Sequence, residues 1–198
     1  ALALLTQAKN NVPRHPYVLS LLSQAYQGLN DWDMLLELLP QLRKHKQLSS
    51  EAFQRLEKQV HHNRLQRCNA DLDRLHAIWK KVPKPLQSDV GIAEIYVRNL
   101  IKCEDYDSAE RVILRALKQA WQPALVREYG YLKGQNASRQ LSQAEKWLKA
   151  HPDDPQLLLC LGRLSARNQV WSKSRLYFES SYRVEHSAEI CAELGRLL

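Results

Sequence analysis

Histidines and clustered carboxylates are the residues of this chain whose types and spacing could do chemistry. His61 and His62 are adjacent, so on a helix their side chains point about 100° apart and cannot bind one metal ion together. Lys58 precedes His62 by four residues and would repel a cation on that helix face. The carboxylates within residues 104–107 fall at an expected turn, where helix capping explains them better than acid–base catalysis.

The cysteines and the known catalytic motifs give no stronger indication of a reaction. The four cysteines lack CxxC spacing, and we expect them to be small buried residues of helices in a reducing compartment. HExxH, GxSxG and Gly-rich phosphate-binding motifs are absent from the sequence. We therefore expect no enzyme activity, no catalytic residue, no metal site and no resident cofactor.

Positive charge is concentrated in the middle of the chain. The formal net charge is +8, and residues 43–84 hold eleven Lys and Arg against four Asp and Glu. Such a field attracts anions, and an acidic partner protein or an anionic membrane surface would be suitable partners. A solvated helix face is the alternative, and nucleic acid is disfavoured because no nucleic-acid-binding signature is present. The candidate residues are Arg55, Lys58, His62, Arg64, Arg67, Lys80 and Lys81.

Helices must position these residues, and the pattern is clearest in residues 155–185. Leu158, Leu161 and Leu164 recur at three-residue steps, which predicts one face of a helix. Gly162 lies inside that helix, where glycine costs about 1 kcal/mol relative to alanine. The usual compensation is a second helix that passes too close for a side chain. We therefore predict a helical hairpin with Phe178 on the second helix.

The hairpin pattern repeats along the chain. Leu161-Gly162 returns as Leu194-Gly195 after 33 residues, close to the repeat of about 34 residues in tetratricopeptide arrays. One shift of the sequence aligns Tyr106 with Trp171, and a longer shift aligns Trp32 with it. We expect these three aromatic residues to pack at matching turns. The chain resembles a tetratricopeptide array, which implies an all-α, right-handed α-solenoid of stacked antiparallel hairpins.

The predicted array is a single domain of hairpins and two half-repeats. Residues 49–83 and 123–150 fit the repeat least well, and the first of these two hairpins carries the basic residues. The expected units are a second helix at 1–13, hairpins at 16–45, 49–83, 89–120, 123–150 and 155–186, and a first helix at 187–198. The half-repeats suggest an excised fragment, and their uncovered apolar faces predict end-to-end self-association.

The resemblance also implies a binding surface. In tetratricopeptide arrays the first helix of each hairpin lines a concave groove, and two positions after the Leu-Gly pair face it. Carried over residue by residue, these positions are Arg98 and Lys102, and Arg163 and Arg167. Each pair is spaced i, i+4 and so shares one helix face. We predict a groove that clamps carboxylates of a peptide or another anion, with ordinary solvated charges as the alternative.

Two segments point to a narrower family. Residues 14–19 (RHPYVL) and 28–40 (GLNDWDMLLELLP) are similar to the HemY proteins of proteobacteria, and residues 100–109 and 158–164 follow in the same order. These are inner-membrane tetratricopeptide proteins linked to late protohaem synthesis. The resemblance implies that this chain corresponds to their C-terminal repeat region, a soluble part beside the bacterial inner membrane, with the cytoplasmic side favoured.

The family resemblance implies a non-catalytic scaffold that binds proteins, with haem-biosynthesis enzymes as the suspected partners. A co-chaperone-type module that binds peptides is the first alternative. A protein that binds haem or porphyrin directly is the second. No apolar run approaches the ~18 residues of a membrane span.

Overall fold

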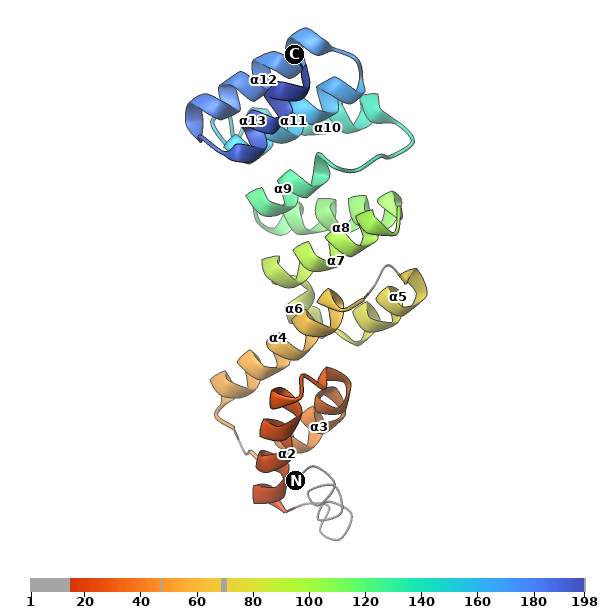
Figure 1. The fold of residues 1–198 in the computed structure, drawn as a ribbon, viewed down its shortest axis with the longest axis vertical. Coiled ribbons are helices and arrows are strands. Elements are labelled where there is room, and N and C mark those ends of the chain that lie inside the picture. Colours follow the sequence, from red (N-terminus) through yellow and green to blue (C-terminus); the bar gives the residue numbers. More distant parts are fainter. Residues whose placement is uncertain (1–14, 47, 69–70, 198) are drawn as a thin grey trace.

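The computed structural model describes residues 15–46, 48–68 and 71–197, which form twelve helices and no strand. The helices stack in chain order along the long axis of the molecule, as Figure 1 shows. The all-α repeat architecture expected from the sequence is confirmed. The helices are α2 (Pro16–Gly28), α3 (Trp32–Lys44), α4 (Ser50–Gln66), α5 (Leu72–Lys81), α6 (Lys84–Gln87), α7 (Val90–Lys102), α8 (Tyr106–Gln119), α9 (Pro123–Tyr129), α10 (Ala137–Leu148), α11 (Pro155–Arg167), α12 (Trp171–Val184) and α13 (Ala188–Leu197).

Three hairpin turns share one backbone geometry. Asn30, Glu104 and Gln169 have φ angles of 56°, 59° and 61°, in the left-handed region that ends many helices. In each turn the next backbone N–H donates to the carbonyl five residues before it, as in a Schellman motif. Each of these residues stands two positions before Trp32, Tyr106 or Trp171, so the turns follow the two shifts found in the sequence.

Aspartates begin several of these helices. The Asp31 carboxylate accepts a hydrogen bond from the Met34 backbone N–H at 3.1 Å and so caps α3. Asp89, Asp105 and Asp154 cap α7, α8 and α11 in the same way. An N-cap satisfies one of the free N–H groups of the first helical turn and is worth about 1 kcal/mol.

Gly162 lies where two helices approach closely. A Cβ atom on Gly162 of α11 would lie 2.3 Å from the ring of Phe178 on α12. The Ser174 hydroxyl also donates to the Gly162 carbonyl at 2.9 Å. The close approach predicted for this glycine is therefore confirmed.

The buried apolar residues form three clusters among the described residues, and two of these clusters share α4. Leu56 and Val60 belong to the cluster of α2 and α3, whereas Leu65 belongs to a cluster that runs from α5 to α11. A third cluster joins α11, α12 and α13 through Leu159, Phe178 and Ile190. Each hairpin thus packs against its neighbours in sequence, as in a solenoid.

Some expectations for individual elements fail or stay predictions. Trp171 is 58% exposed, whereas Trp32 at the matching position is 5% exposed, so the predicted packing of Trp171 is wrong. The apolar cluster that joins α12 to α13 contains Phe178 but not Trp171. The half-repeat at 1–13 lies outside the described residues. Helix α13 occupies the range of the other half-repeat, and end-to-end association stays a prediction.

Candidate functional site

An open groove lies along the first half of α4. Its other wall is the segment Pro83–Asp89, which contains the short helix α6, and Lys46 and Leu48 also line it. The groove encloses about 1260 Å³. It exists because α4 has 17 residues against 13 in α3, and its first turns extend sideways from the stack (Figure 1).

The floor of the groove is apolar. Leu48, Phe53 and Leu86 line it together with Pro83 and Pro85. The Phe53 side chain is only partly buried and lines the groove. The Arg43 guanidinium carbon lies 5.8 Å from the Phe53 ring centroid, within the range of a cation–π contact.

Some charges along the groove are neutralised within the chain. Lys58 Nζ lies 2.7 Å from Asp89 Oδ2, and the exposed pair Arg55–Glu51 is separated by 3.3 Å. Burial acts to raise the pKa of Asp89, but hydrogen bonds from Lys58 and backbone N–H groups hold it below its usual value. Asp89 thus joins α4 to the N-terminus of α7, which it also caps.

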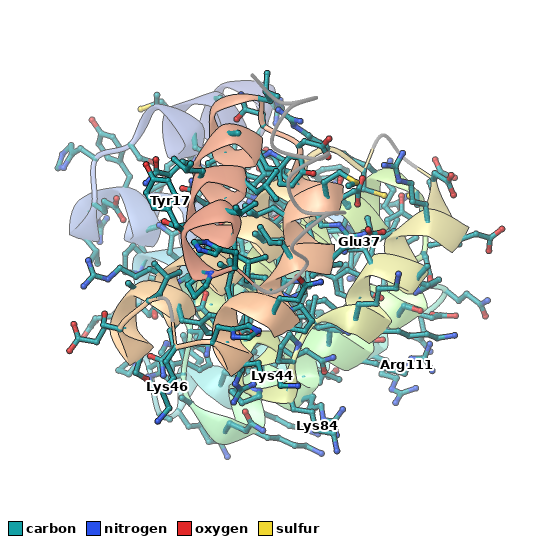
Figure 2. The ribbon with its side chains drawn as sticks, turned by 90° about the horizontal axis from the view of Figure 1, so that it is seen from below. Tyr17, Glu37, Lys44, Lys46, Lys84 and Arg111 are labelled. Carbon is teal, nitrogen blue, oxygen red and sulfur yellow. The ribbon has the colours of Figure 1, made fainter. Side chains whose placement is uncertain are left out.

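Other cations beside the groove form no ion pair among the described residues. Arg43 and Lys46 line the groove, and Lys44 and Lys84 are adjacent to lining residues. Figure 2 shows Lys44, Lys46 and Lys84 on the same side of the molecule in a view along its length. The lining itself has four cations against three carboxylates. These cations therefore give this side its positive charge.

The structure separates the basic residues predicted for the middle hairpin. Arg55 and Lys58 line the groove. Arg64 and Arg67 line a different cleft between the α2–α3 turn and α5. The other three do not line either space: His62 is partly buried on α4, and Lys80 and Lys81 are exposed at the end of α5.

The arginines predicted to clamp carboxylates have partners within the chain. Arg98 Nε donates to Glu128 at 2.9 Å, and Arg163 Nε donates to Glu193 at 2.7 Å. Each glutamate follows its arginine by the same interval, so the pair recurs at the shift that aligns Tyr106 with Trp171. Neither acid was predicted as a partner from the sequence, although that shift aligns them.

The remaining two clamp residues differ from each other. Arg167 donates to the backbone carbonyls of Gly130 and Leu132, whereas Lys102 is exposed and has no ion pair among the described residues. The clamp itself stays a prediction.

Besides the Arg163–Glu193 pair, Glu189 attaches helix α13 to α11 and α9. Glu189 accepts from Arg163 at 2.5 Å, Arg127 at 3.1 Å and the Tyr131 hydroxyl at 2.6 Å. Burial opposes ionisation, but these donors lower the pKa of Glu189 to about 2. No sequence pattern indicated this site, because its members come from separate hairpins.

The described residues contain no group of three or more histidines, cysteines or carboxylates placed to hold a metal ion. Cys160 is fully buried, and burial raises the pKa of its thiol to about 12, which keeps it protonated and a poor nucleophile. The lining of the groove itself presents apolar side chains together with positively charged ones.

None of the helices in the part of the chain that the structure describes has the length and apolar content to cross a membrane.

The fold is similar to that of a solved helical protein. The crystal structure of yeast Tom70 superposes with a TM-score of 0.54 at 12% identity, covering 98% of this chain and 41% of that chain, which supports the fold alone. No protein-family model matches the chain.

Curated relatives match in sequence. Protein HemY of Escherichia coli K12 is 28% identical over 171 residues, which are 85% of this chain and 43% of that protein. Protein HemY of Shigella flexneri matches equally. The chain thus spans less than half the length of the curated relatives it matches. The resemblance to the HemY family predicted from the sequence is confirmed over most of the chain, in a helical-repeat fold.

Proposed function

We propose that this chain is a non-catalytic scaffold module that binds partner proteins through the groove beside α4. Two features together carry the proposal. The first is the apolar floor formed by Leu48, Phe53 and Leu86, and the second is the pair of cations Arg43 and Lys46, which form no ion pair with a described residue. An amphipathic segment with acidic residues along its flanks matches both features.

The size of the groove supports a protein partner. At about 1260 Å³ it exceeds the range of about 300–1,000 Å³ that is usual for small-molecule pockets. It is also open along one side, as a groove for a helix or an extended segment is. An anionic membrane surface would interact with the cations but would leave the recessed floor unfilled, so a protein is the better match.

We further propose that the partners are haem-biosynthesis enzymes at the bacterial inner membrane, on its cytoplasmic side. The support is the similarity to Protein HemY over 85% of the chain, together with the late protohaem synthesis that the family resemblance implies. The peptide-binding co-chaperone alternative requires free cations in the concave groove. Of its four predicted residues, only Lys102 lacks a partner among the described residues.

A binding measurement with matched charge reversals tests this function. The chain is immobilised, and purified ferrochelatase and other late haem-pathway enzymes are passed over it. Arg43→Glu combined with Lys46→Glu should weaken binding at least about tenfold, or about 1.4 kcal/mol. Lys133→Glu combined with Lys149→Glu changes the net charge equally at exposed sites away from the groove and should leave binding unchanged.

Two results would contradict the proposal. The first is an equal loss of binding in both double variants, which would indicate only non-specific attraction. The second is the absence of binding to every enzyme of the set together with groove-dependent binding to phosphatidylglycerol vesicles, which would identify a membrane contact instead.

A further inference from the structure

A second cleft holds three arginines and shares no lining residue with the groove beside α4. It lies between the α2–α3 turn and helices α4 and α5, and it encloses about 350 Å³. The positively charged residues that line it are Arg64, Arg67 and Arg74. The turn contributes Asn30 in its left-handed conformation and Trp32, the first residue of α3.

Two buried donors in this cleft have no acceptor in the part of the chain that the structure describes. The Arg64 side chain is 10% exposed and Trp32 is 5% exposed. Neither Arg64 Nη1 nor Trp32 Nε1 has a hydrogen-bond partner among the described residues. Buried polar groups are nearly always paired, so orphan donors at one cleft indicate an acceptor that binds there.

The existing acceptors do not neutralise the cluster. Asp33 accepts from Arg64 Nε at 2.7 Å and lies 4.0 Å from Arg74. Asp31 is engaged as the N-cap of α3, and the Asn30 carbonyl takes one donor of Arg67 at 2.8 Å. Among the described residues, the exposed Asp33 carboxylate therefore pairs with both Arg64 and Arg74. No carboxylate among them pairs with Arg67.

We propose that this cleft is a binding site for a small oxyanion, a phosphate or carboxylate group. Guanidinium groups recognise both through paired hydrogen bonds, and the volume suits a small ligand. The Asp33 side chain is 63% exposed, so it can rotate into solvent. The incoming ligand then replaces it as the acceptor of Arg64. The Arg64 Nε–H group, which now donates to Asp33, would then donate to the ligand.

The exchange predicts opposite effects for two substitutions at exposed positions. Arg74→Gln removes a cation from the rim and should weaken oxyanion binding about fivefold or more. Asp33→Asn removes the competing carboxylate and should tighten binding by a similar factor. Arg139→Gln, an exposed arginine of α10, changes the net charge like Arg74→Gln and should leave binding unchanged.

The test is a titration of the ¹⁵N-labelled chain with pyrophosphate and, separately, with citrate, at constant ionic strength. The indole N–H resonance of Trp32, assigned by its loss in Trp32→Phe, reports the cleft. A saturable shift that Arg74→Gln weakens and Asp33→Asn strengthens supports the site. Tighter binding of pyrophosphate identifies a phosphate ligand, and tighter binding of citrate identifies a carboxylate.

The proposal is overturned if neither anion gives a saturable shift. It is equally overturned if Arg74→Gln and Asp33→Asn bind with the affinity of the unaltered chain. Loss of binding in Arg139→Gln to the same extent as in Arg74→Gln would also overturn it, because the effect would then follow net charge alone.

Discussion

The ring of Phe178 fills the space that a side chain on Gly162 would need, at 2.3 Å from the position of its Cβ. Gly162→Ala should gain about 1 kcal/mol of helix propensity but lose about 1–3 kcal/mol to overpacking. We expect a net loss of stability in urea unfolding. Gly195→Ala in α13 is the control, and it should stabilise the chain. Apart from its chain neighbours and the backbone of its own helix, no described atom lies within 4 Å of the position of its Cβ.

A double mutant separates this steric conflict from other causes. Phe178→Leu creates space near residue 162, so Gly162→Ala should cost less in that background than alone. Strict additivity of the two changes would show that the ring is not the obstacle.

Glu104 has a φ of 59°, a conformation that costs non-glycine residues about 1–2 kcal/mol. Glu104→Gly should stabilise the chain by about 0.5–1 kcal/mol, because part of the gain is offset by the freedom of glycine in the unfolded chain. Thermal unfolding measures this change. Glu104→Ala retains the strain and should give no gain; an equal gain in both variants would show that loss of the charge is the cause.

His61 is 1% exposed, and burial, reinforced by the nearby Arg64, lowers its pKa from 6.5 to about 4. The folded-state pKa is the lower one, so the unfolded chain takes up the proton first. The stability contribution is complete above about pH 6.5 and is lost as the pH falls towards 4, on the order of 3 kcal/mol in total.

Urea unfolding at several pH values tests this dependence in His61→Leu. His62→Leu, at the partly buried neighbouring position, is the control. His61→Leu should flatten the curve between pH 6.5 and 4. An unchanged slope in His61→Leu would assign the proton uptake to another group.

Glu189 attaches α13 to the array. Burial opposes its ionisation, yet its pKa of about 2 lies below the usual 4.5 because Tyr131, Arg163 and Arg127 donate to it. Its contribution is therefore complete above about pH 4.5 and is lost as the pH falls through 2. Glu189→Gln should increase amide hydrogen exchange in α13 at neutral pH, with little change in α2 and α3. Protection that stays the same throughout α13 would contradict the role of this carboxylate.

The expectation that the chain holds no resident cofactor is tested directly by haemin. A titration of the chain should give no saturable shift of the Soret band. A saturable shift would instead support the alternative of a haem-binding protein.

Periodicity predicted what depends on local repetition. The two shifts that align Trp32 and Tyr106 with Trp171 recovered the hairpin turns, and the glycine argument recovered the contact of Gly162 with Phe178. Both features lie within a single hairpin, so the spacing of residues in the sequence is enough to predict them.

Features that depend on neighbouring hairpins were not predicted. Helix α6 was missed because it lies between the predicted hairpins at 49–83 and 89–120, although proline fits a first helical turn. The wall that α6 adds to the groove was missed with it. The exposure of Trp171 and the partners of Arg163 also depend on which helix packs next, and the pattern of a single hairpin does not contain that information.

The pairing of Gly162 with Phe178 also limits how this array could be rearranged. The aligned positions in the earlier hairpins are Val97 with Ile113 and Ser23 with Leu39, so each hairpin has its own combination of volumes. Transplanting α12 alone into the place of α8 would set a phenyl ring against the branched side chain of Val97. Recombination, whether natural or engineered, would have to exchange both helices of a hairpin together.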